Sequence, residues 1–360
     1  MSYALTVFGP GDVRLAERAE PRPGPGDLLV EPDLVGLCGT DLEIIDGTID
    51  PAYINYPLVL GHEWTGVVAG DAAGADRGSS PLASTALAGR RVIVEGIVGC
   101  GHCVRCARGE VNLCETYDEI GFTRDGAVAG QIVVPAALAH PLDDSVAAED
   151  AVLAEPAAVV YQALTRAGVV PGSRVLVLGD GTIALLCASL LRLWSPAQLA
   201  MLGLRGEQAE LAKAAGATSF GLADSQAGEA GADAGPAGFD LVVEAAGAAS
   251  AVATAVTRVR RGGTVLLIGL PPHGETVPLA VDDIVNNDLT IIGSFGYTPA
   301  SWCGVLALLN SGQLKPGLLI THRYPLADWE RAIAVLRGGG ADEPRGKVLI
   351  ELGRRLDARC

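Results

Sequence analysis

The strongest constraint on the fold lies in the second half of the chain, where short apolar strands alternate with helical stretches. We predict strands near residues 174–178, 198–202, 217–220, 239–243, 264–268 and 289–293. Apolar residues at helical spacing fill the gaps, as in GEQAELAKAAG at 206–216 and SAVATAVTRV at 250–259. Strands joined by helices in this way form a parallel sheet that is covered on both faces. The sequence therefore predicts an α/β fold with a doubly wound sheet.

The turn after the first of these strands has the pattern GxGxxA, in the sequence GDGTIA at 179–184. Between a strand and a helix, this pattern permits a tight turn, a close approach of a pyrophosphate to the backbone, and packing of the helix on the sheet. The helix N-terminus adds free amides and partial positive charge. A tight turn without a ligand is the alternative. We predict a dinucleotide site that includes Gly179, Gly181, Thr182, Ile183 and Ala184.

The end of the second strand indicates which dinucleotide binds. An acidic side chain there would hold the ribose hydroxyls of NAD, whereas a cation would hold the extra phosphate of NADP. The chain has Gly203, Leu204 and Arg205 at this point, and no acid before Glu207. We therefore predict that NADP is preferred and that NAD is also accepted, the alternative being that Arg205 is only a solvated residue at a helix start. Further cofactor contacts are expected at Ala246, Gly269, Ser294 and Phe295.

The first 150 residues have a different texture, with glycine- and proline-rich breaks and no regular alternation with helices. Short β-rich runs occur there, such as DLLVEPDLVG at 27–36 and RRVIVEG at 90–96. They predict a compact β-rich barrel, and the tail GKVLIEL at 346–352 predicts a strand that rejoins it. A chain of 360 residues is long enough for two such domains. We expect surface loops at 70–89 and 221–238.

Four of the eight cysteines follow the spacing CxxCxxCx7C. They are Cys100, Cys103, Cys106 and Cys114. One loop can wrap four such thiolates around a tetrahedral ion, and a site with no open position is typical of structural zinc. Disulfides, scattered buried thiols and an iron–sulfur cluster are the alternatives. His102 is interpreted as a loop residue and not a ligand, and Cys187, Cys303 and Cys360 are assigned no role.

A second set of metal ligands is predicted from three remote segments, which contain Cys38, His62 and Glu155. A thiolate, an imidazole and a carboxylate leave room for a substrate or water, as catalytic zinc requires. Each residue also has an ordinary explanation. Cys38 could be a core residue, His62 a hydrogen-bonded interior histidine, and Glu155 a solvated carboxylate.

Composition excludes several classes of partner. The chain has 26 basic and 42 acidic residues, a net charge of −16, and 49% hydrophobic residues without a long apolar run. A general attraction to nucleic acid or to a membrane is therefore not expected. The first residues, MSYALTVFGPGD, lack the features of a secretion signal. We expect a cytoplasmic protein whose cysteines are mostly thiols.

Taken together, these motifs resemble those of the zinc-dependent medium-chain dehydrogenases, which include alcohol, sorbitol, threonine and glucose dehydrogenases. The resemblance rests on the four-cysteine loop, the GDGTIA turn, LCGTD at 37–41, GHEWTG at 61–66, AEPAAV at 154–159, FDLVVEAAG at 239–247 and THRYPL at 321–326. It implies a GroES-like catalytic domain over residues 1–156 and 295–360. A Rossmann nucleotide-binding domain is implied over residues 157–294.

The resemblance also implies roles for individual residues. Cys38, His62 and Glu155 match the catalytic zinc ligands, and Glu63 matches an acid that can approach the metal, so that each chain would bind two zinc ions. Thr40 would accept the substrate's hydroxyl proton, and Asp41 would hydrogen-bond His62 and fix its tautomer. Local turn capping is the alternative for Thr40 and Asp41.

The implied reaction is hydride transfer between a nicotinamide and the secondary alcohol of a polyol, sugar or cyclitol, which gives the ketone. Glutamate at position 155 is typical of the sorbitol-like branch, whose substrates can chelate the metal through a neighbouring hydroxyl. A simple alcohol or threonine-type amino-alcohol dehydrogenase is one alternative. A zinc-free quinone or enone reductase and a non-catalytic NADPH-binding protein are the others. A homodimer or homotetramer is expected.

Overall fold

The computed structural model describes residues 2–71, 87–223, 238–340 and 343–353. Two compact units can be distinguished. The first comprises Met1–Glu155, Thr298–Ala341 and Lys347–Cys360, and the second comprises Pro156–Tyr297 and Asp342–Gly346. The loops expected at 70–89 and 221–238 lie mostly outside the described residues, as does Cys360. No helix within the described ranges is long and apolar enough to cross a bilayer.

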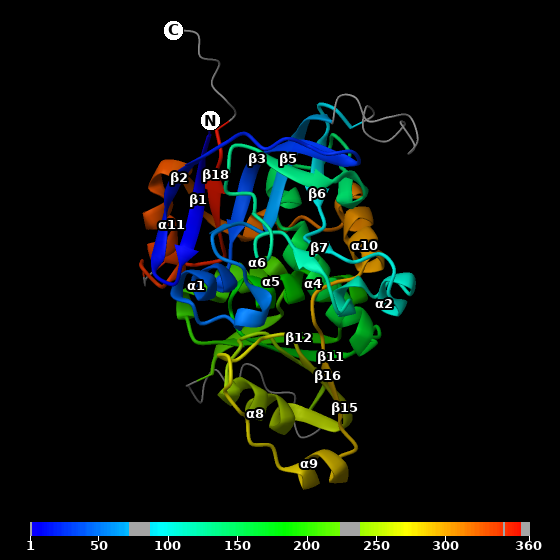
Figure 1. Cartoon of the computed structure of the whole chain (residues 1–360). Helices are drawn as coiled ribbons and strands as arrows, with labels where there is room; N and C mark the ends of the chain where they lie inside the picture. Colours follow the sequence, from blue (N-terminus) through cyan, green and yellow to red (C-terminus); the bar gives the residue numbers. More distant parts are fainter. Residues whose placement is uncertain (1, 72–86, 224–237, 341–342, 354–360) are drawn as a thin grey trace. The chain divides into compact units, whose positions relative to one another are not determined.

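The second unit is built on a six-stranded parallel sheet in the order β13-β12-β11-β14-β15-β16. Figure 1 labels four of its strands, β11, β12, β15 and β16. Its strands are β11 (Arg174–Leu178), β12 (Gln198–Gly203), β13 (Ser219–Leu222), β14 (Phe239–Glu244), β15 (Val259–Leu267) and β16 (Thr290–Gly293). The predicted doubly wound sheet is confirmed. Strand β15 begins at Val259, before the predicted residue 264, because Val259 pairs with Phe239 ahead of an irregularity in the register.

Helices separate these strands along the chain. They are α5 (Thr182–Leu191), α6 (Ala209–Ala215), α8 (Ala249–Arg258) and α9 (Val281–Asn286), with the short segments η4 (Arg192–Trp194) and η5 (Gly206–Gln208). Helix α4 (Ala154–Ala167) precedes the sheet in sequence. Every residue of α5 from Ala184 to Leu191 is buried, which explains why its sequence is apolar almost throughout. The core of the sheet includes Leu176, Val242 and Val265.

The first unit is organised around the long strand β3 (Asp27–Leu37), in which buried and partly buried residues alternate from Asp27 to Leu34. Leu28, Val30 and Leu34 are buried, whereas Leu29 and Glu31 are partly exposed, as a period of two residues requires. The main sheet runs β10-β6-β5-β3-β18-β17, and β9 also pairs with β3. The other strands are β5 (Glu63–Asp71), β6 (Arg91–Val94), β9 (Ile132–Pro135), β10 (Ala139–Pro141), β17 (Ile320–Pro325) and β18 (Lys347–Glu351).

The expectation for the tail is confirmed, because β18 pairs antiparallel with β3 in the register Val348↔Leu37 (Figure 1, red and blue). Residues more than 300 positions apart thus become neighbours. The described part of this unit also contains two small sheets. One is formed by β1 (Ser2–Gly9), β2 (Asp12–Arg18) and β4 (Leu58–Val59), and the other by β7 (Ile97–Val98) and β8 (Asp118–Glu119).

Helices of the first unit lie in its connections. They are α1 (Gly39–Asp46), α2 (Val104–Ala107), α3 (Ala148–Ala151), α10 (Pro299–Asn310) and α11 (Trp329–Leu336). The 3-10 turns are η1 (Pro51–Tyr53), η2 (Val111–Leu113), η3 (Ala136–Leu138), η7 (Pro316–Leu319) and η8 (Leu326–Asp328). The core includes Leu5, Val35, Leu60 and Trp64, which fix β5 and β3 beneath the site described next.

Candidate active site

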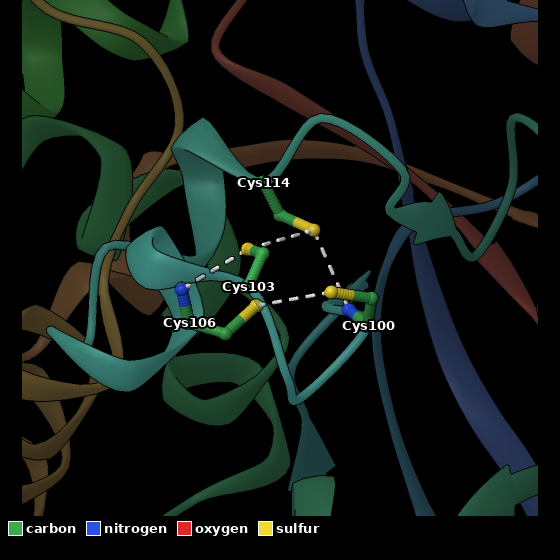
Figure 2. Close-up of side chains that lie close together, drawn as sticks. All are labelled: Cys100, Cys103, Cys106 and Cys114. Carbon is green, nitrogen blue, oxygen red and sulfur yellow. Dashed lines mark hydrogen bonds between the residues drawn. The ribbon is translucent and has the colours of Figure 1, made fainter.

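The four clustered cysteines point their sulfur atoms toward one another (Figure 2). The Sγ atoms of Cys100 and Cys106 are 3.9 Å apart, and those of Cys103 and Cys114 are also 3.9 Å apart. These distances are about twice the length of a disulfide bond, and all four side chains are free thiols. Disulfide pairing within the loop is therefore excluded.

The backbone of the loop is shaped to bring these sulfurs together. Gly101 and Gly109 have φ angles of +76° and +74°, a region that glycine enters without steric cost. Cys103 forms the N-cap of α2, and its Sγ accepts the Cys106 N–H at 3.4 Å. The Cys114 Sγ likewise accepts the Cys100 N–H at 3.4 Å. Amide donors of this kind stabilise thiolates.

The charge distribution of the cluster fits a bound cation. Hydrogen bonds from backbone amides lower the pKa of Cys100 to about 6. Cys106 also accepts an amide, but burial and its three cysteine neighbours raise its pKa to about 12. A divalent cation relieves this repulsion between thiolates, so the donor set fits zinc. The exposed ring of His102 bonds the Cys100 carbonyl oxygen through Nδ1 at 2.8 Å, which agrees with its interpretation as a loop residue.

Cys38 and His62 approach each other from separate elements. Cys38 lies at the N-cap of α1, directly after β3, and His62 directly precedes β5. The Cys38 Sγ lies 3.2 Å from the His62 Nε2. Because β3 and β5 pair in the register Gly36↔Glu63, the sheet itself brings the two side chains together.

Asp41 lies on the other side of the His62 ring, in the first turn of α1. Its Oδ2 accepts the Cys38 N–H at 2.9 Å, so it does cap the local turn. Its Oδ1 lies 3.7 Å from the His62 Nδ1, which is beyond hydrogen-bond distance. Both atoms are buried and have no hydrogen-bond partner among the described residues. Burial disfavours a charged His62, but the negative groups Cys38 and Asp41 outweigh it and raise the His62 pKa well above 6.5.

Glu63 is buried and forms an ion pair with Lys347, the first residue of β18. Both side chains are almost completely excluded from solvent, at 3% and 1% exposure. The Lys347 Nζ also donates to the Leu37 carbonyl oxygen at 3.2 Å. A Cβ at Gly36 would lie 2.5 Å from the Glu63 Oε2, so the neighbouring strand has no room for a side chain there.

Glu155, in the first turn of α4, completes the acidic part of the cluster. Single ligand atoms of His62, Glu63 and Glu155 all lie within 4.8 Å of one another. Cys38, Asp41 and His62 form a second such group, so His62 is common to both. Burial raises the pKa of Glu155 to about 8, with Glu63 and Glu119 adding to it and His62 opposing it.

The structure thus gathers four of the predicted residues, Cys38, Asp41, Glu63 and Glu155, around the His62 ring. Cys38 and Glu155 do not share one 4.8 Å group among the described residues, although each lies in a group with His62. Thr40 is partly exposed on the first turn of α1, two residues after Cys38. Sulfur, imidazole and carboxylate donors gathered around the His62 ring fit a catalytic zinc ion.

Two neighbours of this cluster were not predicted from the sequence. Lys347 could have been noticed, because a lysine in the apolar strand KVLIE needs a buried partner. Glu119 carries no such signal. It belongs to a turn that packs on His62, where the ring of Phe122 lies 4.9 Å from the imidazole. Burial raises the pKa of Glu119 to about 7, and His62 opposes the shift.

All the predicted cofactor residues lie at the carboxyl edge of the parallel sheet in the second unit. Gly203 is the last residue of β12, and the others follow β11 (Gly179, Gly181, Thr182, Ile183, Ala184), β12 (Leu204, Arg205), β14 (Ala246), β15 (Gly269) and β16 (Ser294, Phe295). The edge includes the point between β11 and β14 at which the strand order reverses, the usual dinucleotide position.

The glycine turn at this edge has the expected conformation. Gly179 has a φ of +123°, and a Cβ there would lie 2.9 Å from the Ala245 backbone. Gly181 is the N-cap of α5 and would meet nothing within 4 Å, which leaves space for a phosphate to approach. The Ala246 N–H, by contrast, is bonded to the Glu244 carboxylate at 2.9 Å.

The Arg205 side chain is hydrogen-bonded to Asp180, a residue of the glycine turn itself. Its Nη2 lies 2.7 Å from the Asp180 Oδ1, and its Nε lies 3.1 Å from the same oxygen. The Asp180 Oδ2 accepts the N–H groups of Leu204 and Arg205 at 2.8 and 2.9 Å. The predicted cation is therefore at the end of β12, but it is already paired.

Comparison with known protein families identifies the fold of each unit. Residues 24–144 match the family of alcohol dehydrogenase GroES-like domains, and residues 183–311 match the zinc-binding dehydrogenase family. The first unit thus has the GroES-like fold, and the second has the Rossmann fold.

Relatives of known activity align over almost the whole chain. The erythritol/L-threitol dehydrogenase of Mycolicibacterium smegmatis is 30% identical, over 93% of this chain and 94% of its own. The L-threonine 3-dehydrogenase of Streptomyces coelicolor is 32% identical, over 94% and 95%.

Solved structures agree. A zinc-binding dehydrogenase from Sinorhizobium meliloti bound to NADP is 30% identical, with a TM-score of 0.86 over 98% of this chain and 99% of its own. An alcohol dehydrogenase from Escherichia coli CFT073 in complex with NADH is 29% identical, with a TM-score of 0.87 over 97% and 99%.

Proposed function

Because the chain belongs to the zinc-dependent medium-chain dehydrogenases, we propose that it oxidises a secondary hydroxyl of a polyol, sugar or cyclitol to a ketone, or catalyses the reverse reduction. The observation that carries the proposal is the convergence of Cys38, Glu63 and Glu155 on the ring of His62. The erythritol/L-threitol dehydrogenase among its relatives supports a polyol substrate.

We assign the catalytic ion to Cys38, His62 and Glu155, with Glu63 as a carboxylate near the metal. A bound zinc ion supplies a Lewis acid that makes a coordinated hydroxyl more acidic. Asp41 faces the His62 Nδ1 and favours the tautomer that leaves Nε2 free to act as a ligand. Lys347 neutralises Glu63 and holds its carboxylate against β18.

Thr40 is proposed to accept the proton released by the substrate hydroxyl. Its hydroxyl group lies in the first turn of α1, two residues after the Cys38 thiolate, and it is partly exposed. A side chain in this position can exchange protons with water. The four-cysteine loop is assigned the second zinc ion, which stabilises the fold and takes no part in the chemistry.

The nicotinamide dinucleotide supplies the hydride acceptor or donor. We propose that its pyrophosphate lies at Gly181 and the N-terminus of α5, where the backbone is open. Its adenosine ribose is assigned to the end of β12, at Gly203, Leu204 and Arg205. We expect NADP to be preferred and NAD to be accepted.

A substrate panel tests the proposed reaction. Polyols, cyclitols, aminocyclitols, sugars, simple alcohols and L-threonine are each incubated with the zinc-loaded protein and NADP or NAD, and the absorbance of the reduced nicotinamide is followed. We expect the highest kcat/KM with a polyol, sugar or cyclitol. A preference for L-threonine would support the threonine-type alternative, which the relative from Streptomyces coelicolor favours. Absence of zinc from an active preparation would contradict the proposal.

We also propose that the chain acts as a homodimer or homotetramer through the β16 edge of its parallel sheet. Helix α9 has no buried residue, and Val281 and Val285 are 68% and 69% exposed. Ile291 of the edge strand β16 is also exposed. An edge strand beside exposed apolar residues favours pairing with a second copy. Light scattering tests the assembly.

The free thiols of the described cysteines support the proposed cytoplasmic location.

A further inference from the structure

The carboxylate of Asp180 lies where a strand-end acid would lie in an NAD-binding sheet. A Cβ built at Gly203 would be 2.6 Å from both the Cβ and the Oδ2 of Asp180. No side chain fits at position 203 while Asp180 keeps this conformation. The glycine at the end of β12 is therefore explained by an acid that comes from the neighbouring β11–α5 turn.

The groups that would bind the 2′-phosphate of NADP already donate hydrogen bonds to the Asp180 carboxylate. Its Oδ2 accepts two backbone amides of the 203–205 turn, and its Oδ1 accepts the Nε and Nη2 of Arg205. The Arg205 Nη2 also donates to the Asp180 carbonyl oxygen at 3.1 Å. Within the described part of the chain, no hydrogen bond of this kind is made by the third guanidinium nitrogen, Nη1.

The pair is partly shielded from water, because the side chains of Arg205 and Asp180 are only 23% and 13% exposed. Coulomb interactions are stronger at such a site than at the open surface. A phosphate bound beside Arg205 would gain a guanidinium contact but would also lie close to the Asp180 carboxylate. The net attraction is therefore smaller than an unpaired arginine would provide.

A second arginine belongs to the same neighbourhood. The backbone of Arg345 exchanges hydrogen bonds with the Gln208 side chain at 2.8 and 2.9 Å, and Gln208 also donates to the Asp180 carbonyl oxygen at 2.6 Å. Burial lowers the pKa of Arg345, and the positive charge of Arg205 lowers it further, whereas Asp180 and Glu207 oppose the shift. The four groups named here, Arg205, Arg345, Asp180 and Glu207, therefore carry no formal excess of positive charge.

We propose that Asp180 limits the affinity of this chain for the 2′-phosphate of NADP by pairing with Arg205, so that NAD remains an accepted cofactor. Asp180 acts through Arg205 and is a specificity-determining positioning residue. The inference rests on the proposed use of a nicotinamide dinucleotide and deepens it. It concerns discrimination between the two cofactors and leaves the hydride transfer unchanged.

Calorimetric titration of the zinc-loaded protein tests this inference without any turnover. The probes are 2′,5′-ADP, which carries the diagnostic phosphate, and 5′-AMP, which lacks it. We expect Asp180→Asn to bind 2′,5′-ADP about tenfold more tightly, the scale expected for removing one unit charge beside a phosphate. Binding of 5′-AMP should change by less than about twofold.

The double variant Asp180→Asn/Arg205→Ala separates a specific effect from a general one. If Asp180 acts through Arg205, the gain should disappear in the double variant. Asp240→Asn is the matched control, because Asp240 also pairs with an arginine, Arg260, and accepts a backbone amide, that of Arg174. Asp240 lies near the amino end of β14 and should leave both titrations unchanged.

Four results would overturn the inference. They are weaker binding of 2′,5′-ADP by Asp180→Asn, an equal change for both probes, a gain that persists without Arg205, and no gain in either Asp180 variant. If Asp180→Asn does not fold, Asp180→Ser retains an acceptor for the turn amides and is expected to show the same gain. A wild-type protein that binds neither NADP nor NAD would instead overturn the proposed function. Wild-type binding of both, with no gain in either Asp180 variant, would overturn the inference alone.

Discussion

The two metal-binding clusters of the first unit are built in opposite ways. The four-cysteine cluster occupies fifteen consecutive residues, and its side chains are mostly partly exposed. The cluster around His62 draws on the end of β3, the start of β5 and the start of α4, and most of its side chains are buried. It also contains carboxylates, one of which is paired with Lys347.

This difference explains what each cluster can do. Four similar sulfurs on one short loop form a closed set that stabilises the loop and leaves no position for a substrate. Mixed donors on remote elements depend on the whole fold for their arrangement. A change in the fold alters the second cluster, whereas the first needs only its own loop.

The largest effect is expected from the four-cysteine cluster. Cys106→Ser should reduce the zinc content from two ions to one per chain and prevent stable folding near body temperature. Structural zinc sites of this kind contribute about 10–16 kcal/mol of apparent binding free energy. Elemental analysis and calorimetry measure the two outcomes. Cys303→Ser, at an exposed thiol on α10, should change neither. Two retained zinc ions in Cys106→Ser would contradict the assignment.

The His62 cluster should respond in its chemistry more than in its stability. His62→Ala removes the residue common to both groups of ligands and should reduce zinc from two ions to one. Loss of Lewis acidity worth several kcal/mol predicts a fall in kcat/KM of about 10³-fold or more. His140→Ala is the matched control, since His140 is also paired with a carboxylate, Glu95, at 2.7 Å. Full activity with one zinc ion would disprove the catalytic role of His62.

The sequence was informative where the chemistry is local. The GxGxxA turn, the strand and helix periods and the cysteine spacing involve neighbours in the chain, so each pattern could be interpreted without knowing the fold. The parallel sheet follows from such patterns. The early start of β15 could not be predicted in this way, because it depends on pairing with Phe239 of another strand.

Contacts between remote residues could not be predicted from spacing. The residue types at Cys38, His62 and Glu155 suggested a site, but the pairing of β3 with β5 is what brings Cys38 to His62. The Lys347–Glu63 pair requires β18 to join the same sheet. The Asp180–Arg205 pair was also missed, because the positions of two adjacent turns are known only once β11 and β12 are aligned.

Breaking the buried ion pair should have the next largest effect. Lys347→Met leaves the Glu63 carboxylate buried without its partner, which typically costs about 3–5 kcal/mol in the free energy of unfolding. Urea unfolding of the zinc-loaded protein measures this loss. The double variant Glu63→Gln/Lys347→Met should recover most of it, because neither charge of the pair remains buried without the other. Equal stability of the single variant and the wild type would show that the pair is not important for folding.

Substitution of Thr40 should have a smaller effect on activity, and it distinguishes proton transfer from metal binding. Thr40→Ala should retain two zinc ions and lose about 10²-fold in kcat, the usual contribution of a positioned proton acceptor. Thr40→Ser keeps a hydroxyl group and should restore most of the activity. Elemental analysis and steady-state kinetics together make the test. A fully active Thr40→Ala would leave local capping of α1 as the better explanation.

The smallest effect concerns the pH dependence of stability, which should arise at the His62 cluster. Burial raises the pKa of Glu119 from 4.5 to about 7. The folded state therefore holds a proton that the unfolded state has released between these pH values. The free energy of unfolding should fall as pH rises from about 5 to about 7.5, by about 2 kcal/mol after allowance for partial exposure. Urea unfolding is measured in a Cys38→Ala background, which is designed to remove the catalytic ion and keep the four-cysteine ion. Glu119→Gln should make this fall shallower, and Glu155, whose pKa is raised to about 8, should account for the slope that remains. Glu17→Gln, at an exposed position on β2, should leave the profile unchanged. An undiminished slope in Glu119→Gln would assign the titration to another group.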